Sequence, residues 1–505
     1  MPVRVAENGL RLRPNCVYTN PADRDIRIQG GCIRLSKPLE PEGWRLPIDH
    51  LFRSLGEDQH ERAIGIILSG TGSDGTVGLK EIVVNGGIVL VQAPESCEYD
   101  AMPRSAMATG MVAHALPVAK MPKVLSTYAR HPYVRKRAAA VSAKAAGNPL
   151  RAILELLQQS HGQNFAGYKQ PMLMRRIERR MGLLGIEKTG EYVKRLRRDT
   201  KELGALYKDL LIGVTEFFRD RKAWAALGTQ VLRPLIASKK NGEPIRAWVA
   251  GASTGEEAYT LTMLILAQLR RARKRCPVQV FGTDTNDSAL AHARNGIYPA
   301  GIAHQVPPEY LSRYFHELKD DHHYQVSPEL RESVVFGVHN LLVHPPFSRL
   351  DLVTCRNLLI YLDPEMQQRI LLVFHFALRS DGYLFLGGAE TIGANDKLYR
   401  PVARKWRIYR RIGTTPHEQL AWYPDAATHG TPWLSAQSIP AVPARSTYLA
   451  NAARNALVDH FAPAAVVINA HMEALYFSGP TERFLLQRHG KPCLLYTSRG
   501  SRSAF

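Results

Sequence analysis

Two acidic residues on successive predicted elements could form a ligand site. The stretch "IRAWVAGASTGEEAY" is an apolar strand, a glycine turn that begins at Gly251, and a helix that opens on two glutamates, the second being Glu257. The next strand, "VQVFGTD", ends at Asp284. Glycines let the backbone approach a ligand, and nucleotide-binding α/β folds place an acid on the ribose near this point. The alternative is an ordinary strand, turn and helix whose acids cap the helix.

The acids also restrict the kind of ligand. A phosphate would favour the positive end of the helix, but Glu256 and Glu257 would repel it. The turn has no GK[ST] sequence, so it is not a P-loop. Acid at this place suits hydroxyl groups or a cationic ligand, and S-adenosylmethionine is such a cation.

A third group of polar residues follows another apolar strand. The stretch "LDLVTCRNLLIYLDPEM" predicts a buried strand, then Arg356, Asn357 and Tyr361, then a helix that starts at Pro364. From 245 to 412, predicted strands alternate with helices, which is the pattern of a parallel α/β sheet. Polar groups at the carboxyl edge of parallel strands face the ligand crevice, so we expect all three groups to meet there.

These motifs closely resemble those of the chemotaxis receptor methyltransferases (CheR type). The resemblance covers about Leu150 to Gly413 and rests on several spaced motifs: "IGVTEFFRD", "GASTGEEAY", "GTDTNDSALAHARNGIY", "VHNLLVHPPFSRLDLVTCRNLLIYLD" and "SDGYLFLGGAETI". It implies a class I, Rossmann-like S-adenosylmethionine-dependent methyltransferase domain over 216–413 and an all-α N-terminal domain over 150–215. It also implies methyl transfer to receptor glutamates, giving γ-methyl esters.

The resemblance assigns roles at the donor site. Thr215 and Arg219 should hold the methionyl part, with Arg219 pairing the carboxylate, and Glu257 should face the ammonium side. Asp284 should bind the ribose and Asn340 should contact the adenine side. Gly251 belongs to the cofactor loop.

The acceptor side follows from the same resemblance. Arg356, Asn357 and Tyr361 should line the transfer site, with Arg356 and Tyr361 orienting the incoming carboxylate. A glutamate is already ionised at neutral pH, so the reaction needs positioning rather than a general base, and we expect no catalytic dyad. Gly213 stands where many members carry an asparagine, which removes one possible donor contact.

Charge is concentrated in the predicted helical part. The chain carries +21, and between Lys120 and Leu210 there are 20 Lys and Arg against 7 Asp and Glu, a net of +13. A basic domain can bind nucleic acid, an anionic membrane or an acidic protein surface. The stretch "PMLMRRIERRMGLL" places four arginines at helical spacing: Arg175, Arg176, Arg179 and Arg180. The resemblance favours docking on acidic receptor helices, and the alternative is a solvated helix face.

The same helix should pack inward through a second face. Leu173, Ile177, Met181 and Leu184 share helical spacing on the side away from the arginines. Residues 150–212 as a whole are predicted to be helical.

A nucleic-acid methyltransferase is the rival enzyme class. The stretch "HPPF", His344 to Phe347, mimics the [DN]PP[YF] loop of base-methylating enzymes. That loop should follow its strand, whereas "HPPF" precedes "LDLVTC". Histidine also cannot accept an amino group's hydrogen bonds as an acid or amide does. We therefore expect no specific nucleic acid as partner.

Asp74 lies in a second glycine-rich turn, "ILSGTGSDGT". Residues 11–125 resemble the catalytic domain of the chemotaxis receptor methylesterases (CheB type) through "RPNCVYTNP", "IDHLFRSLGED", "AIGIILSGTGSDGTVGLKEI" and "GGIVLVQAPESCEYDAMPRSAMATG". The resemblance makes Asp74 the acid of a Ser-His-Asp triad. The serine and histidine should precede "RPNCVY", but the residues before Arg11 contain neither. We therefore expect an incomplete, inactive methylesterase part over 1–125.

The remaining segments complete the predicted organisation. We expect linkers at 126–149 and 414–448, the start of an incomplete PAS-like domain at 449–486 and a non-family tail at 487–505. Both ends are expected to be truncated, in a chain from a fused methylesterase, methyltransferase and PAS protein. A non-catalytic receptor scaffold or sensor adaptor is the alternative to the enzyme.

Composition indicates the compartment. The six cysteines form no CxxC pair and are expected to be reduced thiols rather than a zinc site. No run approaches eighteen apolar residues, and the first residues lack the apolar core of a signal peptide. We expect a cytoplasmic protein with no bound metal and no membrane insertion.

Overall fold

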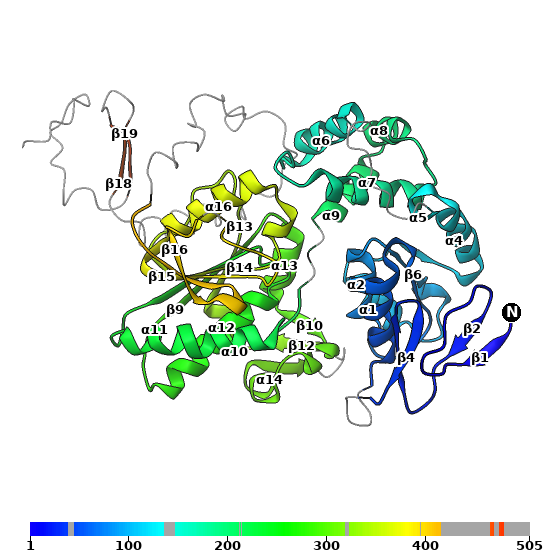
Figure 1. Ribbon diagram of the computed structural model, residues 1–505, viewed down its shortest axis with the longest axis horizontal. Helices are drawn as coiled ribbons and strands as arrows, with labels where there is room; N and C mark the ends of the chain where they lie inside the picture. The colour runs from blue at the N-terminus through cyan, green and yellow to red at the C-terminus, as the bar shows by residue number, and fades with distance from the viewer. Residues whose placement is uncertain are drawn as a thin grey trace, which may run out of the picture. The chain divides into compact units, whose positions relative to one another are not determined.

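The computed structural model describes most of the chain. The described residues are 1–38, 45–135, 147–211, 213, 215–318, 323–393, 395–415, 465–468 and 474–478. Contacts group the chain into two units, Met1–Tyr423 and Pro424–Phe505. Figure 1 shows the helices and strands with the labels used below.

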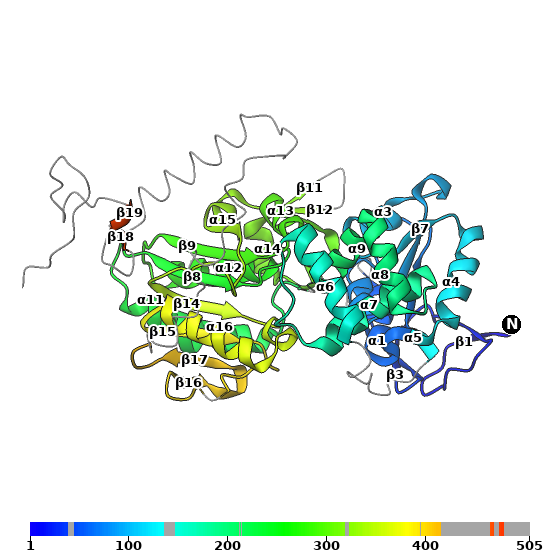
Figure 2. The same ribbon diagram turned by 90° about the horizontal axis from the view of Figure 1, so that it is seen from above.

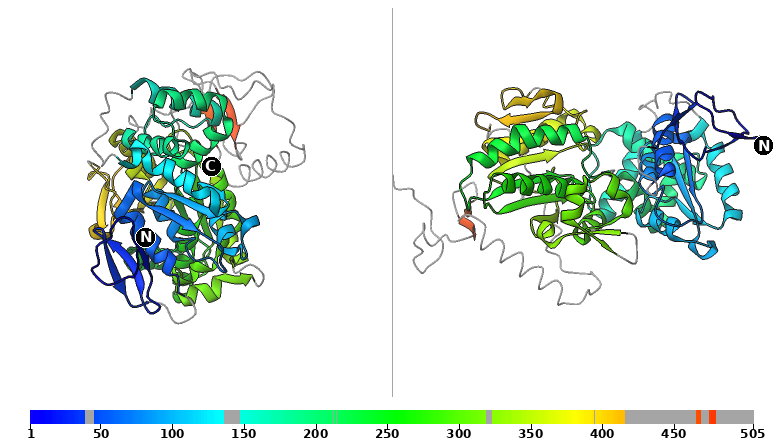
Figure 3. Two further views of the ribbon diagram at one scale, coloured as in Figure 1. Left: turned by 90° about the vertical axis from the view of Figure 1, so that its right-hand side faces the viewer. Right: turned by 90° about the horizontal axis from the view of Figure 1, so that it is seen from below.

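A seven-stranded sheet organises the second half of the first unit, in the order β13-β9-β8-β14-β15-β17-β16. Its strands are β8 (Ile245–Ala250), β9 (Val278–Asp284), β13 (Val334–Val338), β14 (Leu350–Cys355), β15 (Leu378–Leu386), β16 (Tyr399–Ala403) and β17 (Ile408–Arg411). The prediction of a parallel sheet is correct for five strands and wrong for β17 and β16, which pair antiparallel. Arg407, with φ 56°, reverses the chain between these two strands without a helical crossover. Figure 3 shows the pair (gold) at one end of the sheet.

Helices cover both faces of this sheet, so its central strands are buried on both sides. On β8, Ala247 and Val249 pack into one hydrophobic cluster and Trp248 and Ala250 into another, as the two-residue period of a strand requires. The helices are α10 (Arg221–Leu227), α11 (Arg233–Ser238), α12 (Glu256–Arg271), α13 (Asp287–Asn295), α14 (Pro308–Tyr314), α15 (Pro328–Glu332) and α16 (Pro364–Ala377), with a π-helical turn at Gly228–Leu232. Figure 1 shows α16 on the opposite side of the sheet from α11 and α12. A small sheet, β10 (Ile297–Pro299), β12 (His323–Val326) and β11 (Phe315–Leu318), lies beside them.

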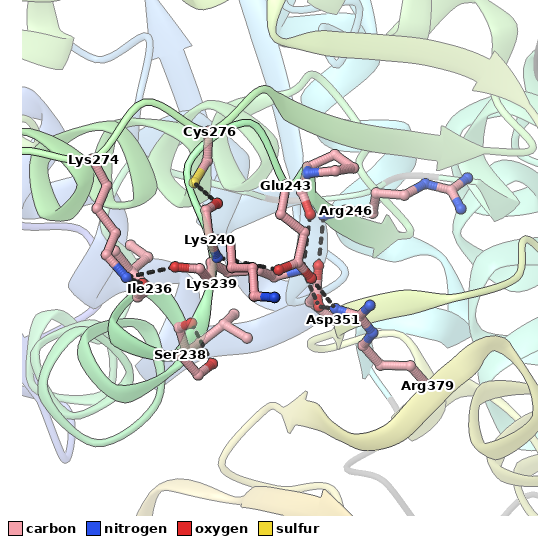
Figure 4. Close-up of polar contacts among 12 residues, drawn as sticks. Ile236, Ser238, Lys239, Lys240, Glu243, Arg246, Lys274, Cys276, Asp351 and Arg379 are labelled. Carbon is pink, nitrogen blue, oxygen red and sulfur yellow. Dashed lines mark hydrogen bonds and ion pairs between the residues drawn. The ribbon is translucent and has the colours of Figure 1, made fainter.

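A buried ion cluster ties the start of β14 to the neighbouring chain. Asp351 is 1% exposed and lies 3.0 Å from Lys239 Nζ, accepts a hydrogen bond from the backbone N–H of Arg246 and pairs with Arg379. Figure 4 shows these groups pointing at one another together with Glu243. The cluster lies at the amino ends of the strands, the edge opposite to Asp284 and Arg356. We interpret it as a stabilising element that fixes β14.

The all-α part has four helices: α6 (Gly147–His161), α7 (Gln170–Leu184), α8 (Thr189–Arg198) and α9 (Thr200–Leu210). The segment is all-α as predicted, although residues 162–169 form a loop between α6 and α7. Figure 2 shows the four packed together. Leu173, Ile177 and Met181 are buried in their core, as predicted, but Leu184 is 36% exposed. Leu184 is the last residue of α7, before Gly185 in the left-handed conformation, and so it lies past the packed part of that face.

The first 135 residues form the expected α/β part. A three-stranded parallel sheet has the order β5-β6-β7, and short pairs β1-β2 and β3-β4 lie before it in sequence. The strands are β1 (Val3–Val5), β2 (Val17–Thr19), β3 (Asp25–Gln29), β4 (Cys32–Ser36), β5 (Ile64–Ile67), β6 (Ile88–Gln92) and β7 (His114–Leu116). The helices are α1 (Pro47–Gln59), α2 (Gly78–Val84), α3 (Ala101–Ala108), α4 (Met121–Arg130) and α5 (Pro132–Arg135).

The second unit is described only in an antiparallel strand pair, β18 (Ala465–Ile468) and β19 (Ala474–Ser478). The rest of the PAS-like prediction over 449–486, the tail at 487–505 and residues 416–448 of the second predicted linker lie outside the described residues. Of the linker predicted at 126–149, only 136–146 lie outside them; residues 126–130 belong to α4, 132–135 to α5 and 147–149 to α6. No helix among the described residues is long and apolar enough to cross a membrane.

Candidate functional site

A pocket lies at the carboxyl ends of β8, β9 and β13, where the sequence predicted the crevice. Its wall is lined by Tyr168, Gly251, Asp284, Thr285, His339, Asn340, Leu341, Leu342, Leu358, Leu362 and Ile370. Gly251 has φ 81°, and a Cβ there would lie 3.0 Å from Leu358. The turn can therefore pass under the pocket only as glycine.

Asp284 is fixed by its neighbours before any ligand binds. Its Oδ1 accepts a hydrogen bond from the Asn286 N–H and its Oδ2 one from the Ser253 N–H, each at 2.9 Å. Burial raises the pKa of Asp284, and these backbone hydrogen bonds oppose the rise. Tyr168, which comes from the loop before α7, has its pKa raised to about 12 by burial and by the charge of Asp284. An oriented carboxylate at this edge is suited to accept hydrogen bonds from hydroxyl groups.

Glu257 and Arg356 form a buried pair beside this pocket. Arg356 Nη1 lies 3.8 Å from Glu257 Oε2, and Glu257 also accepts a hydrogen bond from the Thr354 hydroxyl at 2.7 Å. The Arg356 side chain is 1% exposed, and its guanidinium lies 5.1 Å from the Trp224 ring centroid and 4.8 Å from that of Phe385. Burial raises the pKa of Glu257, and the positive charge of Arg356 opposes the rise. The pair thus keeps a carboxylate available inside a mostly apolar wall.

Arg356 also reaches the "EFFRD" segment. Its Nη2 donates to Asp220 Oδ2 at 2.7 Å and to the Arg219 carbonyl at 3.1 Å. Arg219 itself lies close enough to Glu257 to oppose the rise of that residue's pKa. The structure therefore brings Arg219, Glu257 and Arg356 together. Thr215 lies in the same segment, partly buried.

Gly213, where the asparagine of many relatives is absent, lies next to the glycine turn. A Cβ at Gly213 would lie 2.7 Å from Ser253 Oγ, so a side chain there requires Ser253 to move.

The loop after β14 is held by one carboxylate. Glu390 is 3% exposed and accepts hydrogen bonds from the N–H groups of Asn357, Leu358 and Leu359 and of Gly387, at 2.6–3.0 Å. Asn357 has φ 61°, a left-handed conformation that asparagine tolerates better than most residues. Glu390 thereby fixes the backbone that presents Arg356.

Asn340 and Tyr361 lie where the all-α part meets this edge of the sheet. The Asn340 side chain accepts from the Leu342 N–H at 2.9 Å, and its amide donates to Gln163 at 3.4 Å. The Tyr361 carbonyl accepts from the Lys169 N–H at 2.9 Å. Both positions join the methyltransferase-type domain to the loop between α6 and α7.

Family models match almost the whole described first unit. They are the CheB methylesterase over residues 1–125, the all-alpha domain of the CheR methyltransferase over 148–211 and its SAM binding domain over 213–408. The chain is 33% identical to chemotaxis protein methyltransferase 1 of Pseudomonas aeruginosa over 241 residues, which are 47% of this chain and 87% of that protein. It is 34% identical to the chemotaxis protein methyltransferase of Salmonella typhimurium, over 48% of this chain and 82% of that protein.

The chain belongs to the chemotaxis protein methyltransferase (CheR) family.

A longer relative matches nearly the full chain. The uncharacterized 104.1 kDa protein in the hypE 3' region of Rhodobacter capsulatus is 35% identical over 517 residues, which are 98% of this chain and 53% of that protein. The chain thus spans about half the length of that relative. Among solved structures, the CheB methylesterase catalytic domain of Thermotoga maritima matches 24% of this chain and 67% of that chain at 30% identity and a TM-score of 0.23.

The pocket fits the S-adenosylmethionine for which the matched CheR domain is described. Leucines and Ile370 offer an apolar wall to an adenine ring, with Asn340 at its edge. Asp284 lines the pocket with a carboxylate held by two backbone N–H groups, and Glu257 carries a carboxylate at the same edge of the sheet. Nδ1 of His339, which also lines the pocket, is buried without a hydrogen-bond partner in the structure. The described residues contain no group of three His, Cys, Asp or Glu side chains that could hold a metal.

The four arginines of α7 do not form a fully exposed basic stripe. Arg176 and Arg179 are 7% and 2% exposed. Arg180 pairs with Glu202 at 2.5 Å, and Arg179 pairs with Asp209. Spacing alone placed these residues on one basic face, but packing buries the middle of it. Docking of receptors through them remains a prediction.

Asp74 caps a helix of the CheB-type part. Its carboxylate accepts from the N–H groups of Ile48 and Asp49 at 3.0 Å each, at the start of α1. Burial raises the pKa of Asp74, and these hydrogen bonds and the charge of His50 oppose the rise. In this chain Asp74 therefore has a structural role, whatever its part in a triad.

Sequence reasoning missed four residues that shape the site: Tyr168, Thr354, Asp220 and Glu390. Asp220 and Glu390 stand inside recognised motifs, "EFFRD" and "GGAETI", so their place in those motifs was an available signal. Tyr168 belongs to a different domain from the pocket, and no spacing rule connects it to Asp284.

Proposed function

We propose that this chain transfers methyl groups from S-adenosylmethionine to glutamate side chains of methyl-accepting chemoreceptors or similar receptors, in chemotactic signal transduction. The observation that carries this proposal is the pocket lined by Asp284 at the carboxyl edge of the sheet, together with the Glu257–Arg356 pair at the ends of neighbouring strands. Membership of the CheR family supports the same chemistry. The expected partners are acidic receptor helices, and the expected compartment is the cytoplasm.

The residues act by positioning. When bound, S-adenosylmethionine supplies an electrophilic methyl group next to a positive sulfur. Asp284 would accept the ribose hydroxyls, Arg219 would pair with the methionyl carboxylate, and Glu257 would face the ammonium group. An acceptor glutamate arrives ionised, so no residue needs to remove a proton. The gain in rate comes from alignment of carboxylate, methyl and sulfur.

Arg356 would act mainly through its neighbours. Its guanidinium already contacts Asp220, the Arg219 carbonyl and Glu257, and it lies between two aromatic rings. Such contacts fix the donor-side residues in one geometry, while its positive charge attracts the acceptor carboxylate. Tyr361, partly buried at the edge of the all-α part, is the expected second group on the acceptor side.

We also propose that the CheB-type part does not hydrolyse methyl esters in this chain. Both carboxylate oxygens of Asp74 accept backbone hydrogen bonds at the start of α1. Neither His50 nor Ser36 belongs to the motif positions that supply a methylesterase base and nucleophile. We further propose a fused methylesterase, methyltransferase and PAS organisation, of which the CheB and CheR family models support the first two parts, with methyl transfer as the activity of the present chain.

The test uses the full chain, methyl-labelled S-adenosylmethionine and receptor-containing membranes from the source cells. Label released as volatile methanol by mild alkali identifies glutamate methyl esters. Asp284→Ala should abolish it, and the matched control Asp287→Ala, whose side chain is 73% exposed on α13, should retain it. Donor binding without alkali-labile label would favour a receptor scaffold or sensor adaptor.

A nucleic-acid methyltransferase gains no support from the geometry. Phe347 of "HPPF" is stacked on Phe281 with ring centroids 4.6 Å apart and lies edge-on to Trp248 at 5.1 Å. The aromatic side chain is thus used in packing of the sheet. Label stable to mild alkali, together with loss of binding at high salt, would reverse this judgement.

A further inference from the structure

Helix α2 of the CheB-type part is bound end-on by the arginines of α7. Arg176 donates to the carbonyls of Val83 at 2.8 Å and Val84 at 3.4 Å, and Arg175 donates to that of Asn85. These carbonyls end α2, where a helix has unsatisfied acceptors and partial negative charge. The face that sequence reasoning assigned to receptor helices therefore binds a helix of its own chain.

The same helix reaches the donor-side segment of the CheR-type domain. Lys80 on α2 lies 4.0 Å from Glu256 at the start of α12. Arg53 on the adjacent α1 pairs with Glu216 at 3.3 Å. Glu216 and Glu256 lie close in sequence to Arg219 and Glu257, so α1 and α2 contact the segments that carry these two donor-side residues.

The residue after Lys80 is a glutamate. Glu81 is partly buried, and burial raises its pKa while the positive charges of Arg219 and Arg53 oppose the rise. Glu81 is thus a helix-borne glutamate, the residue type that the enzyme is proposed to methylate, on a helix whose end is bound by the α7 arginines. Arg176 is also close enough to Tyr361 to interact with it, which connects the bound end of α2 to the acceptor side.

We propose that α2 occupies the acceptor-helix site as an internal pseudosubstrate, with Glu81 in place of a receptor glutamate, so that receptors must displace the CheB-type part before methylation. This inference rests on the proposed function. Its basis is geometric: Arg175 and Arg176, on the face expected to dock receptor helices, hold the end of α2, and Lys80 anchors the helix to Glu256.

A direct test is zero-length carbodiimide cross-linking of the full chain. Lys80 and Glu256 should form an amide that mass spectrometry detects, and Lys80→Arg should remove it. A helical receptor methyl-acceptor fragment added in excess should lower the yield of this cross-link at least threefold. An unchanged yield would overturn the proposal. Because this readout needs no methyl transfer, it stands apart from a failure of the proposed function.

The kinetic test releases the helix by charge reversal. Arg53→Glu with Lys80→Glu places like charges against Glu216 and Glu256, and should raise kcat/KM for the receptor fragment about tenfold with the KM for S-adenosylmethionine unchanged. The matched control, Arg62→Glu with Lys123→Glu, changes the same charge on exposed positions of the same part and should leave the rate unchanged.

Variants of Glu81 test whether this residue occupies the acceptor site, competes with the donor carboxylate or is itself methylated. Glu81→Gln should lower the KM for the receptor fragment while folding and cross-linking are kept. A change only in the KM for S-adenosylmethionine would mean that Glu81 competes with the donor carboxylate, which overturns the acceptor-site assignment. Methyl label on Glu81 would make it a substrate and would equally overturn the proposal.

Discussion

Arg356 offers the sharpest test of the donor site. Its guanidinium compensates the buried Glu257, whose other polar partner is the Thr354 hydroxyl. Leaving a buried charge without its partner typically costs about 3–5 kcal/mol. Without Arg356, the buried Glu257 is driven toward its protonated form, and a neutral Glu257 no longer attracts the donor's ammonium group. We take about 3 kcal/mol, the low end because the closest approach is 3.8 Å, as the loss in donor binding, which weakens the Kd roughly 150-fold. We expect this for Arg356→Met.

Arg356→Lys separates charge from geometry. A lysine keeps the positive charge but cannot contact Asp220 and Glu257 together or stack between Trp224 and Phe385 as a planar guanidinium does. We expect a loss of about 1.5 kcal/mol, or roughly tenfold in Kd.

The pH dependence of donor affinity tests whether the effect of Arg356→Met passes through Glu257. Burial already raises the pKa of Glu257, and removal of Arg356 raises it further because the opposing charge is lost. Donor affinity of Arg356→Met should therefore fall more steeply than that of the wild type as the pH is lowered from 9 to 6. The assay is isothermal titration of S-adenosylmethionine across this range, with the fitted stoichiometry reporting the folded fraction.

Arg151→Met is the matched control, because Arg151 is 81% exposed and pairs with Glu155 on the surface of α6. A Kd for Arg356→Met within threefold of the wild type at every pH would refute the argument. So would a large loss with an unaltered pH profile, since the effect would then not pass through Glu257.

Three further predictions concern stability and the loop after β14. Asp351→Asn should lower the free energy of unfolding in urea by about 3 kcal/mol, because Lys239 stays buried, whereas the exposed Glu365→Gln should change it by less than about 0.5. Burial and the charge of Asp74 raise the pKa of Asp49 to about 7, so the wild type loses stability as the pH rises from about 4 through 7; thermal unfolding of Asp49→Asn should lack this loss. Glu390→Ala should lower the methyl-transfer rate at least tenfold in steady-state assays, since each lost charged hydrogen bond is worth about 1.5–3 kcal/mol.

Periodicity and strand-end logic predicted the parallel α/β sheet, and the family resemblance added the CheR-type fold and the roles of the site residues. Parallel strands end at one edge, so acids and amides placed just after apolar runs had to meet, and Asp284 and Asn340 do line one pocket. The same logic failed for β16 and β17, because local patterns do not specify the direction in which an edge strand is added. It also could not predict that Tyr168, from the all-α part, lines the pocket.

The sequence also did not predict which groups the charged side chains contact or how deeply they are buried. Helical spacing correctly placed Arg175, Arg176, Arg179 and Arg180 near one another, but exposure depends on what packs against the helix. Arg356 illustrates the same point. The resemblance assigned it to the transfer site, but its burial depends on Trp224 and Phe385, which are distant from it in the sequence.

The contacts around α2 can regulate receptor methylation only if their free energy is neither negligible nor too large for a receptor to overcome. Lys80–Glu256 and Arg53–Glu216 are partly exposed ion pairs, which are worth about 0–1 kcal/mol each. Arginine–carbonyl contacts at the end of α2 add charge-assisted hydrogen bonds of about 1.5–3 kcal/mol before solvent competition. If the docked state of α2 is favoured by a few kcal/mol, methylation is suppressed by one to three orders of magnitude. A receptor that binds the same arginines at micromolar affinity, about 8 kcal/mol, can overcome it. The geometry therefore favours a threshold that receptors pass by mass action rather than a permanent inhibition of the CheR-type domain.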